Sequence, residues 1–364
     1  MKLNTPTIAF TGGGSSGHVT PNIALIKNFQ QLNWSVFYIG SKNGIEKELI
    51  TREKIPYYSV SSGKLRRYFS WQNFLDPFKT VWGILQALLI FRKTKPDVLF
   101  SKGGFVAFPV VVAAWLTRIP VIAHESDMTP GLANRLSFPF AKKICLTFET
   151  GKQFFSDPNK VLITGTPLRP ALLQGNAEKG RQFCGFDANK KVILIYGGGS
   201  GADRINIAMR QHLTELLSDF HIIHLCGKSK TDAAFENIKG YKQFEYVHEE
   251  LGDLLAAADL VISRAGANSI YELLALRKPS ILIPLSAKAS RGDQIQNAEY
   301  FEEKGLMTVL PDERLSDGAL LSVIQKVSDE LPEVRRRLND YPVENAIQRI
   351  TALVQEYART KTLP

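Results

Sequence analysis

The sequence predicts an α/β protein of two Rossmann-like domains, each built on a parallel sheet and facing the other across a cleft. A length of 364 residues exceeds one ordinary core and fits two domains. Short β-rich runs alternate with helical patterns, as they do in βαβ units. A buried strand followed by a glycine cluster and a helix occurs twice, about 185 residues apart, which indicates two similar domains.

The first of these openings consists of the apolar run 8–10, the segment Gly12–His18 and a helical pattern that includes Ile23 and Phe29. Glycines let a ligand approach the backbone, and the free N–H groups at a helix start suit an anion. The second opening runs from 192–196 into Gly197–Gly201. Neither is a P-loop or a complete dinucleotide fingerprint, because the required lysine or acidic residue is missing. Together they predict a phosphate or sugar site.

The elements of the first domain follow in order. Strands are predicted at 8–10, 36–39, 97–100, 120–123 and 161–163, with helical patterns between them. Ligands of such sheets bind at the carboxyl ends of the strands. The candidate site loops are therefore 12–18, 40–42, 101–105 and 124–127.

The proline-containing segment 165–170 marks the predicted domain boundary. We expect one domain over 1–164 and another over 165–342, with a last helix at 343–359 that packs back on the first domain. The strands of the second domain are predicted at 192–196, 221–225, 243–246, 260–263 and 280–285.

The composition is that of a globular protein, with 44% hydrophobic and 22% charged residues. The longest apolar run, Val106–Leu116, is far short of a membrane-spanning helix. The N-terminus lacks the apolar stretch of a secretory signal. Three widely spaced cysteines argue for a reducing compartment and against a disulfide framework or a zinc site. We therefore expect a cytoplasmic protein.

The charge is uneven along the chain. Of the net charge of +10, residues 1–165 carry +11 and the remainder carries −1. A basic half attracts nucleic acid, a membrane surface or a phosphorylated substrate, although a merely well-solvated basic surface would look the same.

The segment from Ser62 to Leu89 combines basic residues with an aromatic-rich helical pattern. An interfacial membrane contact has this composition, since cations meet anionic head groups and aromatic rings lie at the apolar boundary. The alternative is a helix that packs its apolar stripe on the sheet. Under that alternative, Trp71, Phe74 and Phe78 are the residues most expected to stay exposed.

Three residues of the first domain are candidates for proton transfer. His18 follows Gly17 and can act as a general base on a hydroxyl, or have only a local role at a helix start. His124 and Glu125 lie at a strand end and can bind sugar hydroxyls, assist proton transfer or form a structural pair. His212, His221 and His224 lie within regular elements and are interpreted as structural. No cluster of His, Cys, Asp and Glu has metal-ligand spacing, so we expect no protein-bound metal, and a soluble divalent cation on a diphosphate stays an alternative. We also expect no cofactor.

In the second domain, small residues open a predicted helix after the strand 260–262, where amide groups and the helix dipole favour a diphosphate. Glu272, about two turns further on, can accept both hydroxyls of a ribose or be a solvated surface residue. The amide of Gln294 suits a sugar hydroxyl.

Five motifs, at 12–22, 101–106, 124–134, 263–268 and 291–298, resemble those of the MurG family, the peptidoglycan N-acetylglucosaminyltransferases with the two-domain GT-B fold. The resemblance covers nearly the whole chain in order and is greatest to forms from low-GC Gram-positive bacteria. It implies transfer of N-acetylglucosamine from UDP-GlcNAc to the C4 hydroxyl of undecaprenyl-diphosphate-N-acetylmuramoyl-pentapeptide, at the cytoplasmic face of the cell membrane. The implied partners are these two substrates and an anionic membrane surface. Other cell-wall synthesis proteins are further candidate partners, and nucleic acid is not.

The resemblance also implies site residues. In the second domain, His248 would read the uracil through its backbone, Glu272 would hold the ribose, and Gln294, with Asp293 beside it, would contact the sugar. The diphosphate would be received by Ala267, Asn268, Ser269, Ile270 and Tyr271. Ser15, Ser16, Gly17, Asp127 and Arg169 would complete the donor site from the other side of the cleft. The remaining substrate-binding candidates are Asn134, Gly199 and Ser200.

Two positions depart from the family pattern. Gly199 replaces a usual serine, so that a hydroxyl contact is lost or passes to Ser200, and Asp127 stands where many members carry asparagine. The mechanism we expect is inverting and metal-independent, with His18 as base and Glu125 and His124 as helpers. The alternatives are a related transferase for another lipid acceptor such as diacylglycerol, an epimerase on UDP-GlcNAc, or a membrane-associated nucleotide-binding scaffold without catalysis.

Overall fold

The computed structural model describes residues 5–63, 72–197, 202–287 and 292–359. The chain divides into two compact units. Unit 1 comprises residues 1–169 and 344–364, and unit 2 comprises residues 170–343. Both contain a parallel sheet with helices, so the prediction of two α/β domains is confirmed.

Unit 1 has a seven-stranded sheet in the order β3-β2-β1-β4-β5-β6-β7, with every neighbouring pair parallel. Its strands are β1 (Thr7–Thr11), β2 (Ser35–Ser41), β3 (Tyr57–Val60), β4 (Val98–Ser101), β5 (Val121–Glu125), β6 (Lys143–Leu146) and β7 (Val161–Ile163). Its helices are α1 (Thr20–Gln31), α2 (Ile45–Arg52), α3 (Gln72–Thr94), α4 (Ala107–Leu116), α5 (Leu132–Ser137) and α15 (Ala346–Arg359), with short 3-10 turns η1 (Ser16–His18), η2 (Phe138–Phe140), η3 (Glu149–Phe154) and η4 (Pro158–Lys160).

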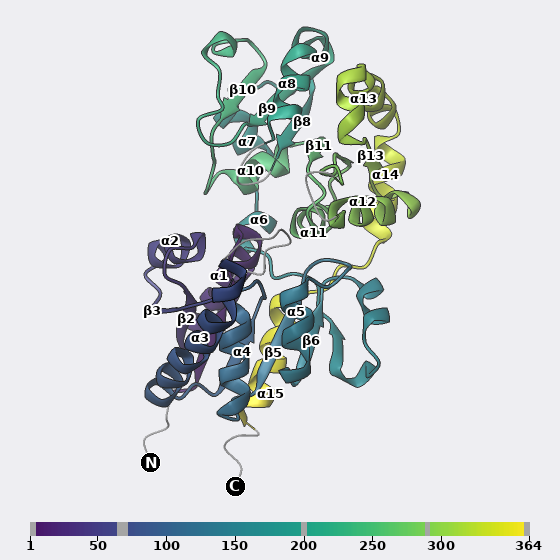
Figure 1. The fold of residues 1–364 in the computed structure, drawn as a ribbon. Helices are drawn as coiled ribbons and strands as arrows, with labels where there is room; N and C mark the ends of the chain where they lie inside the picture. The colour runs from purple at the N-terminus through teal and green to yellow at the C-terminus, as the bar shows by residue number, and fades with distance from the viewer. Residues whose placement is uncertain (1–4, 64–71, 198–201, 288–291, 360–364) are drawn as a thin grey trace. The chain divides into compact units, whose positions relative to one another are not determined.

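The two faces of the first sheet carry separate apolar cores. Along β1 successive side chains point to opposite faces, so Ile8 and Phe10 join the core that includes α1 and α15, whereas Ala9 joins the core that includes α4. Both faces of a parallel sheet are covered in this way, which explains the continuous apolar runs seen in the sequence. Helix α15, yellow in Figure 1, belongs to this unit although it is the last element of the chain.

Helix α3 presents a row of apolar side chains to solvent, which we call the α3 stripe: Phe78, Val81, Trp82, Leu85 and Leu89. Their spacing of three and four residues places them on one helix face, with exposed fractions from 47% for Leu85 to 74% for Phe78. The expected exposure of Phe78 is therefore confirmed, and the packing alternative is wrong for the other four. Trp71 lies outside the described residues, as does the side chain of Phe74.

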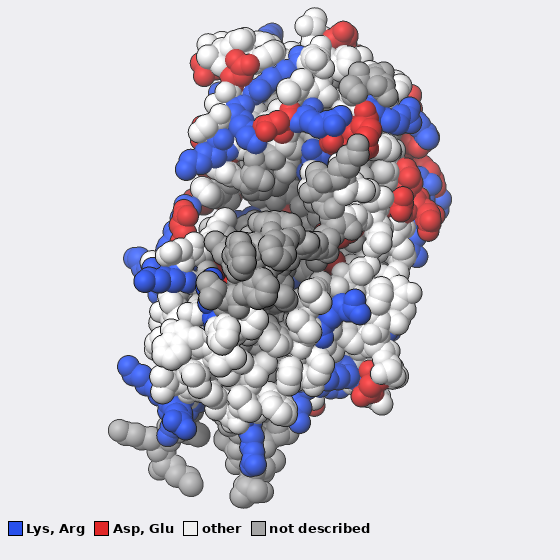
Figure 2. Space-filling view, viewed as in Figure 1, with Lys and Arg blue, Asp and Glu red and all other residues white. Residues whose placement is uncertain are grey.

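The opposite face of α3 packs on the sheet through Ala87 and Phe91, which are buried in the core with α4. Trp115 and Leu116 of α4, each 53% exposed, extend the apolar surface of unit 1. On the face of this unit seen in Figure 2, blue lysine and arginine atoms are frequent and red acidic atoms are few.

Unit 2 has a six-stranded parallel sheet in the order β10-β9-β8-β11-β12-β13. Its strands are β8 (Lys191–Tyr196), β9 (Phe220–Leu225), β10 (Tyr241–Phe244), β11 (Leu260–Ser263), β12 (Ser280–Leu282) and β13 (Thr308–Val309). Its helices are α6 (Pro170–Leu173), α7 (Ala177–Cys184), α8 (Asp203–Gln211), α9 (Leu213–Asp219), α10 (Leu251–Ala257), α11 (Ala267–Ala275), α12 (Asp293–Glu303), α13 (Ala319–Asp329) and α14 (Leu331–Asp340), with 3-10 turns η5 (Ala233–Phe235) and η6 (Asp312–Asp317).

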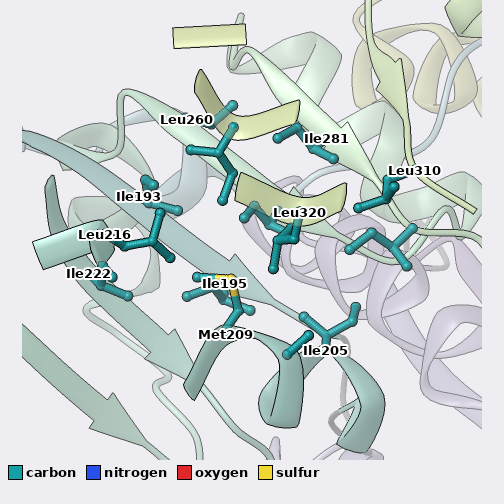
Figure 3. Packing of buried hydrophobic residues seen from close by; sticks show 14 of the residues in the cluster. Ile193, Ile195, Ile205, Met209, Leu216, Ile222, Leu260, Ile281, Leu310 and Leu320 are labelled. Carbon is teal, nitrogen blue, oxygen red and sulfur yellow. The ribbon is translucent and has the colours of Figure 1, made fainter. Parts of the chain in front are cut away.

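The core on one face of this sheet is drawn in Figure 3. Met209 of α8, Leu216 of α9 and Leu320 of α13 pack on isoleucine and leucine side chains of β8, β9, β11 and β12. All three are at most 3% exposed. This packing holds the strands of the second sheet in place, and the strands in turn position the segments that follow them.

Candidate functional site

In unit 1 the predicted loops after β1, β4 and β5 meet, because these strands are neighbours in the sheet. The Gly13 amide donates to the Gly103 carbonyl at 3.2 Å. A Cβ on Gly103 would lie only 2.1 Å from Asn134 Oδ1, so the loop after β4 also touches the segment after β5. The segments that follow these three strands are therefore in contact with one another.

Glycine is required where these loops touch. Gly104 has a φ of +85°, and a Cβ there would lie 2.1 Å from the Gly13 carbonyl oxygen and 3.1 Å from His18 Nδ1. Any larger residue would push the loop after β1 away from the loop after β4.

His18 ends the 3-10 turn η1, and its ring is half-buried. Its Nδ1 lies 2.9 Å from the Gly13 carbonyl oxygen and 3.4 Å from Ser15 Oγ. A carbonyl only accepts, so Nδ1 carries the proton and the neutral ring keeps its lone pair on Nε2. The loop backbone therefore sets the tautomer that a general base needs.

Three residues that the sequence analysis did not single out hold the loop after β1. Tyr38 Oη donates to the Gly12 carbonyl at 2.8 Å, and Asn22 Nδ2 donates to the Thr11 carbonyl at 3.2 Å. The fully buried Glu46 accepts from the amides of Ser41, at 3.0 Å, and Gly14, at 3.4 Å. The available signal for Glu46 was an acidic residue in the first turn of a helix that follows a strand.

His124 is fully buried in β5. Its Nε2 donates to the Gly165 carbonyl at 2.8 Å, and its Nδ1 accepts from Lys102 Nζ at 2.8 Å. Burial, reinforced by the charge of Lys102, lowers the pKa of His124 well below its ordinary value. The neutral ring therefore uses both nitrogens inside the fold, which suits a positioning role better than proton transfer.

Glu125 organises the segment that follows it. Its carboxylate accepts from the Asp127 amide at 3.0 Å, the Gly131 amide at 3.1 Å and Asn134 Nδ2 at 2.8 Å. Burial raises the pKa of Glu125, and these donors oppose the rise. Since both oxygens accept, the ionised form fits the geometry. Asn134 Nδ2 also donates to the backbone carbonyl of His124 at 3.3 Å, and Asp127 is half-buried at the start of the segment.

The other candidates of unit 1 lie at its loops. Ser15 is exposed, Ser16 and Gly17 are half-buried in η1, and Arg169 is half-buried at the last position before unit 2. Lys102, in the loop after β4, was not among the candidates, yet it contacts His124 directly.

In unit 2 the helix α11 starts immediately after the loop that follows β11. Its N-cap is Gly266, and among the described residues no side chain caps this end. Ala267, Ile270 and Tyr271 are buried, whereas Asn268 and Ser269 are half-buried. The backbone amides of the first turn and the helix dipole make this end suitable for an anion.

Two polar side chains lie close to strand ends of the same sheet. Tyr196 Oη, at the end of β8, donates to Glu272 Oε2 at 3.4 Å, and Glu272 is half-buried. Gln294, in the first turn of α12, accepts from the Leu285 amide through Oε1 at 3.1 Å. Its Nε2 remains the donor end of the amide.

His248 is exposed in the segment between β10 and α10, and Asp293 begins α12. Gly199 and Ser200 lie outside the described residues. Arg264 makes a structural ion pair, since its Nη1 lies 2.6 Å from the buried Asp312 Oδ1.

Within the described ranges, no group of three or more His, Cys, Asp and Glu side chains could hold a metal ion. In the same part of the chain, none of the helices has the length and apolar character needed to cross a membrane.

The chain thus combines a parallel-sheet unit that has a glycine loop after its first strand with a second parallel-sheet unit in which no described side chain caps the start of α11, and the family models identify the class of protein. Residues 8–146 match the glycosyltransferase family 28 N-terminal domain, and residues 192–350 match the glycosyltransferase family 28 C-terminal domain. The chain therefore belongs to glycosyltransferase family 28 and is a glycosyltransferase.

Similar curated proteins span the whole length. One from Legionella pneumophila (strain Paris) is 57% identical over 98% of this chain and 99% of its own, and one from Clostridium perfringens (strain SM101) is 52% identical over 96% and 98%. Both are named UDP-N-acetylglucosamine–N-acetylmuramyl-(pentapeptide) pyrophosphoryl-undecaprenol N-acetylglucosamine transferase. The Legionella protein shares more identity, so the expectation of greatest resemblance to low-GC Gram-positive forms is wrong.

Among solved structures, MurG of Acinetobacter baumannii matches with a TM-score of 0.76 and 24% identity, covering 96% of this chain and 99% of that one. The UDP-GlcNAc 2-epimerase of Neisseria meningitidis, bound to UDP-GlcNAc, matches with a TM-score of 0.65 and 15% identity, covering 97% and 100%. At these identities the likeness is one of fold, and the fold is the expected GT-B type.

Proposed function

We propose that this enzyme transfers N-acetylglucosamine from UDP-GlcNAc to the C4 hydroxyl of undecaprenyl-diphosphate-N-acetylmuramoyl-pentapeptide. The observation that carries the proposal is 57% identity, over 98% of the chain, to a protein named for that activity. The acceptor hydroxyl attacks the anomeric carbon, the bond to UDP breaks, and the hydroxyl proton passes to a base on the enzyme.

We assign the base to His18. Its Nδ1 hydrogen bond to Gly13 leaves Nε2 as the proton acceptor, and its loop is fixed by Tyr38, Asn22 and Glu46. General-base catalysis by a positioned side chain contributes about 10²- to 10⁴-fold to the rate. Glu125 and His124 serve in this assignment as anchors, because their polar atoms are engaged within unit 1.

The same unit supplies further contacts to the substrates. We assign substrate binding to Ser15, Ser16, Gly17, Asp127, Asn134 and Arg169. Asn134 is 6% exposed and its Nδ2 is held by Glu125, so its assignment requires the segment to move or the substrate to meet its backbone.

We assign UDP-GlcNAc to unit 2. The amides at the start of α11, from Ala267 to Tyr271, receive the diphosphate, and the helix dipole stabilises the charge that develops when UDP leaves. Glu272 takes the ribose hydroxyls and Gln294 a hydroxyl of the sugar, with His248 at the uracil and Gly199 and Ser200 as further candidate contacts.

The experiment incubates the purified protein with labelled UDP-GlcNAc and, separately, with the muramoyl-pentapeptide lipid, diacylglycerol or no acceptor. Transfer to the muramoyl lipid alone supports the proposal. Transfer only to diacylglycerol, or conversion of the donor sugar without an acceptor, would replace it with another lipid transferase or an epimerase. Donor binding with no turnover would indicate a scaffold.

We also propose that unit 1 binds an anionic membrane surface through the α3 stripe. Five apolar side chains on one helix face, with Lys79 and Arg92 on the same helix, have the composition of an interfacial helix. In this proposal the enzyme is a peripheral protein at the cytoplasmic face of the cell membrane, where its lipid-linked acceptor would lie.

The test compares sedimentation of the wild type and of the Trp82→Gln/Leu89→Gln double variant with phosphatidylglycerol-rich vesicles. Burial of large apolar side chains contributes roughly 1.5–3 kcal/mol each, so the double variant should bind about a hundredfold or more weakly. The matched control, Ile207→Gln on α8 of unit 2, replaces a similarly exposed apolar residue and should bind like wild type. Equal binding of all three proteins would refute the assignment.

A further inference from the structure

Lys102 is an unusual residue of unit 1. Among the residues that the structure describes, it is the one lysine or arginine that is buried, with 1% of its surface exposed. Removing a cation from water costs free energy, and an apolar side chain of similar size would fill the same space without that cost. Packing alone therefore does not explain the ammonium group, and its hydrogen bonds indicate what it does.

The ammonium joins two consecutive parts of β5 and its loop. Lys102 Nζ donates to His124 Nδ1 at 2.8 Å and to Ser126 Oγ. These two partners flank Glu125, whose carboxylate holds the segment up to Asn134. The cation thus contacts the chain on either side of the residue that organises this segment.

The contacts continue beyond His124. Its Nε2 donates to the Gly165 carbonyl, in the segment that follows β7. Gly165 has a φ of +74°, and its neighbour Thr166 bonds through Oγ1 to Thr147 Oγ1 at 2.8 Å. A chain of hydrogen bonds therefore runs from the loop after β4, through β5, to the segment that leads to Arg169.

The base of the side chain contacts the loop that carries His18. The Lys102 amide donates to the Thr11 carbonyl at 2.9 Å, and a Cβ on Gly12 would lie 3.1 Å from Lys102 Cβ. Lys102 is thus held at one end by the loop after β1 and reaches the loop after β5 at the other. Both loops contain residues to which we assign substrate binding.

We propose that Lys102 is a positioning residue of the transfer reaction: through Ser126 and His124 it fixes the loop after β5 and the Gly165 carbonyl relative to the loop that carries His18. The inference rests on the proposed function. It gives Lys102 no contact with substrate, in keeping with its burial. Misplacement of catalytic groups by about 1 Å costs up to about 10²-fold in rate, which is the scale on which such a residue acts.

The electrostatics agree with this role. Burial lowers the pKa of Lys102 to about 7, and the carboxylates of Glu125 and Asp127 oppose the change. The same cation favours the ionised form of Glu125, which its three donors require. Loss of the ammonium would thus weaken the Glu125 anchor as well as the bonds to Ser126 and His124.

The experiment measures kcat and both KM values for Lys102→Met, Ser126→Ala and the double variant. Methionine keeps the length and apolar stem but removes the donor. We expect Lys102→Met to lower kcat roughly tenfold or more while the KM for UDP-GlcNAc, whose proposed site is in unit 2, stays within about twofold. Lys27→Met, which removes an exposed lysine paired with Glu53 on the surface of the same unit, is the matched control and should behave as wild type.

The double variant tests whether Lys102 acts through Ser126. If Lys102 acts through Ser126, the double variant should lose no more than Lys102→Met, whereas multiplied losses would overturn the proposal. A kcat of Lys102→Met within twofold of wild type would overturn it too. Should Lys102→Met fail to fold, Ser126→Ala decides alone: it should lower kcat at an unchanged donor KM, and wild-type kinetics would refute the proposal.

The wild-type reaction in the same assay distinguishes a failure of the proposed function from a failure of the Lys102 inference. Absence of transfer by the wild type would overturn the proposed function and this inference with it. An active wild type together with an equally active Lys102→Met variant would overturn the inference alone.

Discussion

Replacing Glu125 by glutamine tests the anchor of the loop after β5 most directly. In the wild type one carboxylate oxygen accepts from the Asp127 amide, and the other accepts from the Gly131 amide and Asn134 Nδ2. A glutamine can keep its oxygen at the position with two donors. Its NH₂ group then faces the Asp127 amide, so that a hydrogen bond is replaced by two opposed donors.

The expected cost follows from that count. A hydrogen bond to a charged group contributes about 1.5–3 kcal/mol, so losing one and the charge should destabilise unit 1 by about 2 kcal/mol. For a unit of this size, that lowers the thermal midpoint by roughly 4–8 °C. If the activation free energy rises by the same amount of about 2 kcal/mol, kcat falls about 30-fold, because each 1.36 kcal/mol is a factor of ten in rate.

The chain offers a specific readout for unit 1. All four tryptophans of the protein lie within the first 115 residues, so tryptophan fluorescence follows the unfolding of this unit. Glu149→Gln, at a side chain that is 76% exposed and paired with Lys152, is the matched control and should leave midpoint and kcat unchanged. A Glu125→Gln variant with the wild-type midpoint and kcat would refute the proposed anchor.

Three further predictions concern single positions. His18→Ala should lower kcat by roughly 100-fold or more with little change in donor affinity, and near-normal turnover would remove His18 from the role of base. Gly104→Ala should destabilise unit 1 and reduce activity, because its Cβ would lie 2.1 Å from the Gly13 carbonyl oxygen, whereas Gly185→Ala, with open space around the Cβ, should affect activity little. Burial lowers the pKa of His224 to about 3, so the unfolded chain binds a proton that folded unit 2 does not, and stability is lost as the pH falls below about 6.5. At pH 5 the loss should be about 2 kcal/mol, seen as a circular-dichroism transition of unit 2, and a His224→Gln variant that keeps the same slope would contradict this origin.

The sequence predicted most of the architecture because the apolar runs of buried parallel strands are strong local signals. The runs 8–10, 36–39, 97–100 and 120–123 fall within or beside β1, β2, β4 and β5. The strands β3, β6 and β13 were not predicted. β3 and β13 are short strands at the sheet edges with mostly half-buried side chains, and β6 has only four residues, the first of which is Lys143.

The candidate site was less accessible to sequence reasoning, because its key contacts join residues far apart in the chain. His124 was predicted as a possible proton carrier from its place at a strand end. Only the structure shows that Lys102 and Gly165 engage its two nitrogens. Similarly, the apolar pattern of α3 allowed either a membrane contact or packing on the sheet, because spacing alone cannot tell which side of a helix meets the sheet.

The membership of α15 in unit 1 has a consequence for biosynthesis. Ile350 and Val354 of this helix complete the core around β1 and α1, although more than 170 residues of unit 2 separate them from the rest of unit 1. On the ribosome, unit 2 can therefore finish folding before α15 packs on the core of unit 1. The core of unit 1 becomes complete only when α15 has left the exit tunnel.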